Sequence, residues 1–150
     1  MGADRNKETV RRIVDAINTG DAAHLRDVMH RTVADDMVGH APGEPDFHGP
    51  EGYLDFVMDF CSVVPDLQVE IVDLIAEDDL VVAQLLFRGT HGGELMGLPP
   101  TGRKVSVPEV AICHMREGEL AELFLYWDNL DILRQLGVEI ETEAGQAEQE

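Results

Sequence analysis

The sequence is poor in basic residues, and this limits what the protein can bind. Its 150 residues contain 11 Lys and Arg against 30 Asp and Glu, a net charge of −19. Such a surface repels phosphate backbones and anionic headgroups, so we expect neither nucleic acid nor a membrane as partner. No apolar run approaches the roughly 18 residues of a membrane-spanning helix. Residues 1–7 also lack the apolar core of a signal peptide.

Cysteine is equally scarce, and the common cofactor motifs are missing. Cys61 and Cys113 form no CxxC pair and are too few for a disulfide framework, which predicts a reduced, cytoplasmic setting. The six histidines show no pair at metal-ligand spacing on one predicted element. Gly92-Gly93 has neither a GxGxxG pattern nor a phosphate-binding lysine. We therefore expect neither a metal nor an organic cofactor.

The 44% hydrophobic content is sufficient for one core, and its pattern begins with helices. Apolar residues at helical spacing predict a first helix over residues 7–19. Asp21 is placed to cap a second short helix, and Pro50 suits the first turn of a third. Residues 31–49 lose this periodicity and predict a long irregular loop.

From Pro65 onward the sequence favours strands. Strands are predicted over residues 67–76, 80–90, 105–115 and 120–127, and a last helix near Asn129. Helices followed by strands that pair as hairpins indicate an α+β fold: a curled antiparallel sheet with N-terminal helices over a central cavity. Residues 1–137 then form the domain, and residues 138–150 form an acidic tail that we expect to be flexible.

A family resemblance is strongest in the loop after the second strand. Residues 87–102, FRGTHGGELMGLPPTG, resemble the signature of SnoaL-like polyketide (ester) cyclases, part of the NTF2-like superfamily of cone-shaped barrels. Pro65-Asp66-Leu67, Gly118-Glu119-Leu120 and the ending over residues 128–137 are similar to further family segments. The resemblance spans roughly residues 7–137.

The resemblance implies an intramolecular aldol condensation that closes a ring of a polyketide ester without metal or cofactor. The family's acid/base aspartate matches Asp128, and a family histidine position matches His114. One departure concerns the pocket wall: where many relatives carry His-Trp, this chain has Leu123-Phe124, and its tryptophan is displaced to Trp127. A homodimer formed through the outer sheet face is also implied.

The residues themselves leave two interpretations of Asp128. The carboxylate follows an apolar run, where desolvation would raise its pKa and make it a better base. Alternatively, Asp128 caps the last helix. In an aldol cyclisation one carboxylate can both remove the carbon-bound proton and protonate the new alkoxide.

Three histidines are candidate assistants: His40, His91 and His114, each of which could instead be structural. About six residues of strand offset separate His114 from Asp128, close to 20 Å on straight strands, so a direct pair is not assumed. A bulge at the Glu117-Gly118 turn would place His114 on one face with the even-numbered residues 122–128. Without the bulge, His114 would share a face with Leu123, Leu125 and Trp127. Pro108 predicts a local break in the sheet near residues 127–128.

Large apolar side chains could form the wall of a substrate pocket or belong to the plain core. The candidates for substrate binding are Trp127, Tyr126, Phe124, Phe87, Met96, Phe60, Tyr53 and Met58.

The predicted function is thus a cyclase acting on an aromatic or linear polyketide ester. Two alternatives stay open: another enzyme on the same fold (a hydroxylase, an epoxide hydrolase or an isomerase), or a ligand-binding module without catalysis. The strongly negative charge would slow anionic substrates, which favours an esterified substrate over a free acid.

Overall fold

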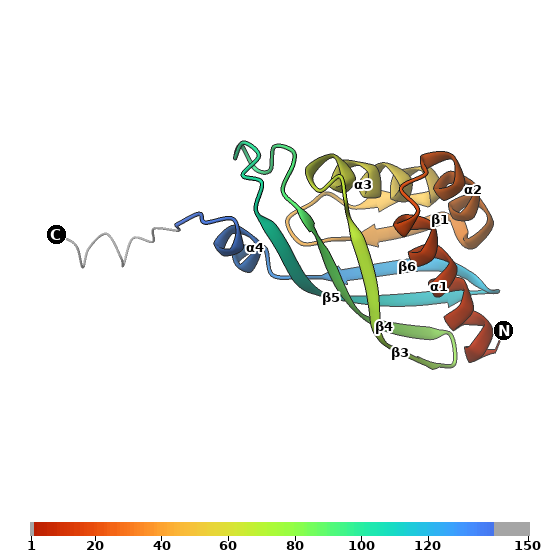
Figure 1. Cartoon of the computed structure of the whole chain (residues 1–150). Helices are drawn as coiled ribbons and strands as arrows, with labels where there is room; N and C mark the ends of the chain where they lie inside the picture. The colour runs from red at the N-terminus through yellow and green to blue at the C-terminus, as the bar shows by residue number, and fades with distance from the viewer. Residues whose placement is uncertain (1, 140–150) are drawn as a thin grey trace.

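The computed structural model describes residues 2–139, in which helices cover one side of a curled, six-stranded sheet (Figure 1). In chain order the elements are α1 (Ala3–Asn18), α2 (Ala22–Thr32), β1 (Val33–His40), β2 (Phe47–His48), α3 (Gly49–Val63), β3 (Gln68–Glu77), β4 (Leu80–Thr90), β5 (Lys104–Arg116), β6 (Glu119–Tyr126) and α4 (Asn129–Gln135). The predicted α+β fold is confirmed, with a sheet that stays open. Most of the predicted acidic tail, from residue 140, lies outside the described residues.

The four long strands pair as the sequence predicts. The sheet order is β2-β1-β6-β5-β4-β3, so that β3 to β6 form consecutive antiparallel hairpins. Both tight turns place a non-glycine residue at positive φ, Asp78 at 53° and Glu117 at 53°. These local turns explain why the strand boundaries could be predicted closely.

The prediction of a long irregular loop over residues 31–49 is wrong, because this segment contains β1 and β2. Strand β1 pairs in parallel with β6, which makes the sheet mixed rather than wholly antiparallel. Its register shifts between Val33 and Val38, and Asp35 and Asp36 are both exposed. This shift breaks the alternation of apolar and polar residues by which a strand is usually detected.

Two further bulges decide which side chains face the helices. In β3 the register shifts between Ile71 and Asp73, so that Ile71 and Leu74 pack against the core while Ile75 is 65% exposed. Between β5 and β6 the register shifts between His114 and Met115, and His114 pairs with Glu122. The bulged arrangement is therefore the one that forms. The odd-numbered residues of β5 lie on the concave, helix-covered face. In β6 the bulge changes the parity, so that Leu120, Leu123 and Leu125 lie on that face.

The helices are fixed over that concave face by specific polar contacts. The Asn18 side chain at the end of α1 both accepts from Val69 N (2.7 Å) and donates to Val69 O (2.8 Å) on the edge strand β3. Asp21 caps α2 as predicted, accepting from two backbone N–H groups, and Pro50 lies in the first turn of α3. As a result, the apolar faces of α1 and α3 stand opposite β4 to β6.

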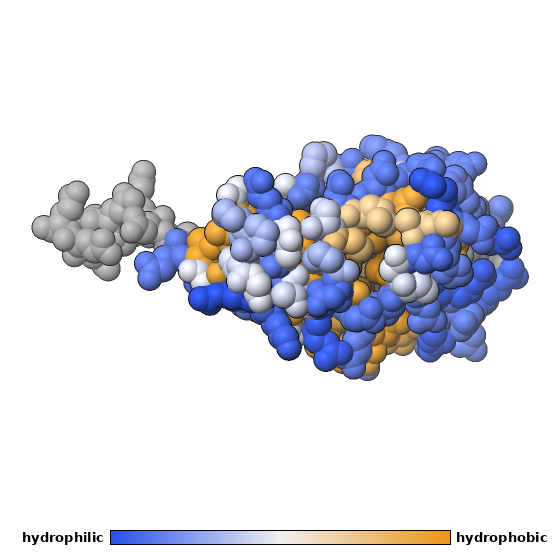
Figure 2. Space-filling model, turned by 45° about the horizontal axis from the view of Figure 1, so that its top comes forward, coloured by the Kyte–Doolittle hydropathy of each residue, from blue (hydrophilic) through white to orange (hydrophobic). Residues whose placement is uncertain are grey.

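The face of the molecule seen in Figure 2 is mostly hydrophilic. Figure 2 shows one face on which polar residues dominate and hydrophobic residues reach the surface only in places. Within residues 2–139 there is no helix both long and apolar enough to cross a membrane.

Candidate active site

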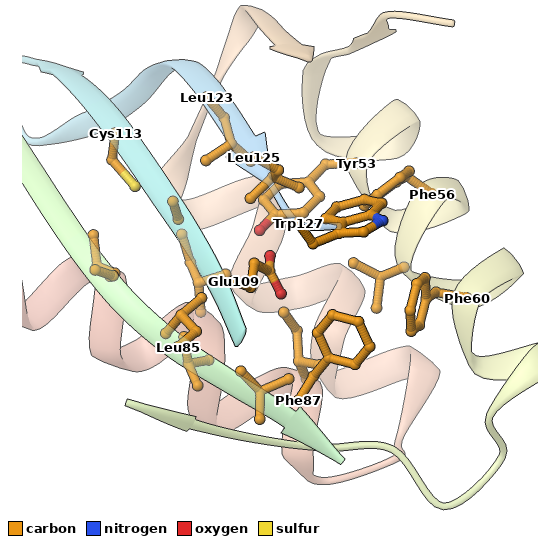
Figure 3. A pocket seen from close by; sticks show the side chains of 18 of the residues that line it. Tyr53, Phe56, Phe60, Leu85, Phe87, Glu109, Cys113, Leu123, Leu125 and Trp127 are labelled. Carbon is orange, nitrogen blue, oxygen red and sulfur yellow. The ribbon is translucent and has the colours of Figure 1, made fainter. Parts of the chain in front are cut away.

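A small cavity lies between α1, α3 and the concave face of the sheet, and we call it the inner cavity. Its volume is about 80 Å³. Apolar side chains form nearly all of its wall (Figure 3). They are Val10, Ile13, Val14 and Ile17 from α1, Tyr53, Phe56, Val57 and Phe60 from α3, and Leu67, Val69, Ala83, Leu85, Phe87, Ala111, Cys113, Leu120, Leu123, Leu125 and Trp127 from or next to the sheet.

Glu109 is the one carboxyl-bearing residue among those that line the inner cavity. Figure 3 shows its carboxyl group amid the apolar side chains of the pocket. Burial raises the pKa of Glu109 from its ordinary 4.5 to about 7, because the low-dielectric surroundings disfavour the charged form. Among the described residues, no group donates a hydrogen bond that would offset this effect.

The position of Glu109 follows from strand alternation in β5. Val107 and Ala111, two residues before and after it, are both buried on the concave face. The ladder between β5 and β6 ends at the pair Val110–Tyr126, next to Pro108, where the sequence predicts a break. Glu109 therefore lies just beyond the last paired residues, where β6 bends away and the cavity begins.

Two other titratable groups line the inner cavity, and both remain neutral at ordinary pH. Burial raises the pKa of the Tyr53 hydroxyl, and the nearby acidic groups at Cys113 and Glu109 raise it further. Burial, together with Glu109, raises the pKa of the Cys113 thiol to about 12. Tyr53 is therefore available as a hydrogen-bond donor and Cys113 is not an activated nucleophile.

A second, larger cavity adjoins the first, and we call it the outer cavity. Its volume is about 350 Å³, and it shares Phe56, Phe60, Phe87 and Trp127 with the inner cavity. The rings of Phe56, Phe60 and Phe87 all lie 6.2–6.3 Å from that of Trp127, measured between centroids. The four rings thus form an aromatic boundary between the two cavities.

The outer cavity also has polar lining groups, chiefly His91, Asn129, Glu44 and Asp59. His91 begins the loop after β4 and is 1% exposed. The Asn129 side chain accepts from Trp127 Nε1 (2.7 Å) and donates to Pro42 O (3.2 Å). It thereby fixes the indole ring at the boundary.

Asp128, the predicted acid/base, occupies a different environment. Its side chain is exposed and its Oδ1 accepts from Leu130 N (2.9 Å) and Asp131 N (3.1 Å), which makes it the N-cap of α4. It lines neither cavity. The capping interpretation is thus visible in the structure, whereas a catalytic role for Asp128 stays a prediction without geometric support.

The candidate histidines do not form one site: His40 and His114 both contact Phe124, whereas His91 lines the outer cavity. His40 bridges Asp46 and Glu122 (2.9 Å each) and stacks on Phe124, and it lines neither cavity. His114 is exposed on the outer sheet face, edge-on to Phe124. Of the three, His91 is the one that lines a cavity.

Five of the eight predicted substrate-binding side chains line a cavity: Tyr53, Phe60, Phe87, Met96 and Trp127. The other three do not, because Tyr126 and Phe124 point to the outer sheet face and Met58 lies on the outside of α3, 38% exposed.

Sequence reasoning missed Glu109 and Phe56. A signal for Glu109 is present, since it interrupts the apolar series at odd-numbered positions from Val105 to Met115. Recognising it requires knowing that this parity faces inward.

No group of three or more His, Cys, Asp or Glu side chains placed to hold a metal ion occurs within residues 2–139. The two cysteines are free. The inner cavity offers one carboxyl group with a raised pKa, which can transfer protons.

The open, curled sheet and its helix-covered cavity define a cone-shaped α+β protein of the NTF2-like kind. The family model of SnoaL-like polyketide cyclases matches residues 7–136, so the chain belongs to this family.

Named relatives of the chain are methyl ester cyclases. The chain is 28% identical over 131 residues (87% of this chain, 89% of the relative) to the aklanonic acid methyl ester cyclase DnrD of Streptomyces peucetius. It is 30% identical over 132 residues (85% and 88%) to the aklanonic acid methyl ester cyclase AcmA of Streptomyces galilaeus. The crystal structure of a SnoaL-like polyketide cyclase from Jannaschia sp. CCS1 superposes with a TM-score of 0.83 at 25% identity, covering 92% of this chain and 95% of the other.

Proposed function

We propose that this protein closes a ring of a polyketide-type ester by intramolecular aldol condensation, with Glu109 as the acid/base. The observation that carries the proposal is the placement of a single carboxyl group, with a pKa of about 7, in an otherwise apolar cavity. A general base is most effective when its pKa lies near the working pH. Family membership supports the cyclase class, and the geometry supports Glu109.

The reaction begins with removal of a proton from carbon. The Glu109 carboxylate takes a proton from a carbon flanked by two carbonyl groups, which leaves an enolate and a neutral carboxylic acid. The enolate carbon then attacks a second carbonyl of the same molecule, and this forms the new C–C bond and an alkoxide. Protonated Glu109 returns its proton to the alkoxide. The product is an isomer of the substrate, and the base is regenerated.

The apolar wall and Tyr53 support these steps. The wall keeps water away from the enolate and holds the two reacting carbons close, and such positioning supplies a large part of the rate. The Tyr53 hydroxyl is neutral and has no hydrogen-bond partner among the described residues, so it can donate to the enolate oxygen. No step requires a group from outside the chain.

The proposed substrate is a neutral methyl ester. A net charge of −19 and two acidic residues at the outer cavity, Glu44 and Asp59, disfavour a free carboxylate. The names of the relatives refer to aklanonic acid methyl ester, which makes this compound the first substrate to test.

The deciding experiment compares wild type with Glu109→Gln and Asp128→Asn in the presence of aklanonic acid methyl ester, without added metal or cofactor. Product is followed by chromatography and mass. We expect ring closure at unchanged mass, a loss of at least 100-fold in kcat for Glu109→Gln, and near-wild-type turnover for Asp128→Asn, which keeps a capping side chain. The kcat/KM of the wild type should rise with pH up to about 7 and then level off.

Other outcomes identify the alternatives. A product heavier by one oxygen would indicate a hydroxylase. Saturable binding without turnover by the wild type would indicate a binding module. Loss of activity in Asp128→Asn with Glu109→Gln unaffected would return the acid/base role to Asp128.

Two further properties are proposed with this function. We propose a homodimer, supported by apolar residues Val110 and Tyr126 exposed on the outer sheet face, 37% and 53%. We also propose a cytoplasmic location, supported by two unpaired cysteines. Sedimentation analysis and cell fractionation test them.

A further inference from the structure

The inner cavity is too small to hold a whole polyketide, whereas the outer cavity is large enough for most of one. Small-molecule sites usually measure about 300–1,000 Å³. The inner cavity of about 80 Å³ can hold one end of such a molecule, whereas the outer cavity of about 350 Å³ can hold most of the rest. If the reacting carbon lies at Glu109, as in the proposed function on which this inference rests, the remainder of the substrate passes the aromatic boundary into the outer cavity.

His91 is the buried polar side chain of the outer cavity, and one of its two ring nitrogens is occupied. Its Nδ1 accepts a hydrogen bond from Thr101 N (3.1 Å) and lies 2.9 Å from Thr101 Oγ1. A neutral imidazole that accepts at Nδ1 carries its proton on Nε2. His91 therefore presents an N–H donor at Nε2.

That donor has no partner within the described residues. Nε2 of His91 is buried and forms no hydrogen bond. Buried donors in native proteins are nearly always paired, and the exceptions commonly serve a functional purpose. His91 is among the residues that line the outer cavity, so a molecule bound there is the nearest source of an acceptor from outside the chain.

The backbone around His91 is held firmly, which favours a preorganised donor. His91 N donates to Arg103 O (2.8 Å), and Gly102 N donates to His91 O (3.0 Å). The following Gly92 and Gly93 both donate to Val63 O at the end of α3. A side chain anchored in this way binds a ligand with little loss of conformational freedom.

We propose that the His91 Nε2–H group binds the substrate by donating a hydrogen bond to a carbonyl oxygen of the polyketide portion held in the outer cavity. In this proposal His91 does not transfer a proton. The ligand class is a neutral polyketide with a carbonyl remote from the reacting carbon. The bond fixes how far the substrate reaches into the inner cavity and thus which carbon meets Glu109.

Binding tests this inference independently of turnover. In a Glu109→Gln background, we would measure Kd by calorimetry for aklanonic acid methyl ester and for an analogue whose remote carbonyl is reduced to methylene. His91→Asn keeps an acceptor near the Nδ1 position but lacks the distal N–H. We expect it to weaken binding of the ester about tenfold and that of the analogue hardly at all. Thr101→Val, which disturbs the same loop but leaves Nε2 in place, is the matched control and should weaken both ligands equally.

A spectroscopic readout accompanies the binding data. With ¹⁵N-labelled histidine, the Nε2–H resonance of His91 should shift downfield on addition of the ester, as expected for a newly formed hydrogen bond. Equal losses for both ligands in His91→Asn, an unmoved resonance, or no binding of the ester to the parent protein would each overturn the inference. If the wild type turns the ester over while His91→Asn weakens both ligands equally or the resonance does not move, the inference fails and the proposed function stands. If His91→Asn weakens binding of the ester alone but the wild type does not turn it over, the proposed function fails and the inference stands.

Discussion

The indole nitrogen of Trp127 donates a 2.7 Å hydrogen bond to Oδ1 of Asn129, two residues further along the chain. This contact turns both side chains toward the cavities and leaves the intervening Asp128 facing solvent, where it caps α4. The bend between β6 and α4 therefore separates the residue that resembles the family's catalytic aspartate from the pocket. The carboxyl group inside the pocket comes from the neighbouring strand instead.

The capping role of Asp128 predicts a defined cost. Asp128→Ala removes the acceptor for Leu130 N and Asp131 N, and loss of an N-cap costs about 1 kcal/mol. We expect the free energy of unfolding to fall by that amount, because α4 packs Ile132 and Leu136 against the core. Asp128→Asn, a comparably good cap, should stay within a few tenths of a kcal/mol of the wild type. Urea denaturation at pH 7 measures both, and equal stability of the two variants would contradict the assignment.

Glu109 predicts that stability depends on pH. A folded-state pKa raised from 4.5 to about 7 means that the folded protein binds a proton more tightly than the unfolded chain. Stability should therefore fall as pH rises from about 4.5 to 7 and stay level above that. The full effect amounts to at most about 3 kcal/mol.

Glu109→Gln tests this directly, because glutamine does not titrate. We expect the variant to match the wild type near pH 4.5 and to exceed its stability by up to about 3 kcal/mol at pH 8. Glu119→Gln, which removes an exposed glutamate at the start of β6, is the control. A constant difference between Glu109→Gln and the wild type across this range would refute the raised pKa.

His40 also predicts that stability depends on pH, but here hydrogen bonds to carboxylates, and not burial, raise the pKa. Hydrogen bonds that the His40 imidazole donates to Glu122 and then to Asp46 raise its pKa, because both carboxylates favour its charged form. The stability that this pairing contributes is fully present below the unfolded-state pKa of about 6.5 and is lost as pH rises through the higher folded-state pKa.

The matched variants are His40→Gln and His24→Gln, the latter on the exposed face of α2. We expect His40→Gln to lower the Tm most at pH 6 and progressively less above pH 7, and His24→Gln serves as the control for loss of an exposed histidine. NMR titration of the imidazole gives the pKa directly. A His40 value at or below 6.5 would show that the bridge does not hold the charged form.

Substitution of alanine at Gly93 and at Gly52 should change the free energy of unfolding in opposite directions. A Cβ at Gly93 would meet Ser62 O at 2.0 Å, in the contact that joins the His91 loop to α3. Gly93→Ala should therefore cost roughly 1–3 kcal/mol, since backbone must move. A Cβ at Gly52, inside α3, meets nothing closer than 3.5 Å, and Gly52→Ala should stabilise by about 0.5–1 kcal/mol. Thermal unfolding of both variants measures the contrast, and the prediction fails if Gly93→Ala unfolds like the wild type.

Local signals account for most of the fold that the sequence predicts. Strand β4 occupies residues 80–90 as expected, and Asp21 and Pro50 begin α2 and α3 where their chemistry suggests. Turns, caps and hydrophobic periodicity act between neighbours in the chain, so they can be read without knowledge of the fold.

Sequence reasoning missed strand β1 and the cavity residue Glu109 for the same reason: both depend on packing between segments that are distant in the sequence. Strand β1 is stabilised by pairing with β6, about 80 residues away, and its own sequence shows no clean alternation. Glu109 faces the cavity because the helices cover the side of β5 on which its odd-numbered residues lie. A bulge shifts side chains by one position and so exchanges the two faces of a strand, which composition does not reveal.

The sequence by itself determined the α+β class, the hairpin order, the acidic surface and the family, because each depends on local pattern or on composition. Only the tertiary structure decided which carboxyl group enters the cavity and which caps a helix. That choice depends on which face of β5 the helices cover and where the chain bends after Trp127, and both are settled by packing between segments that are distant in the sequence.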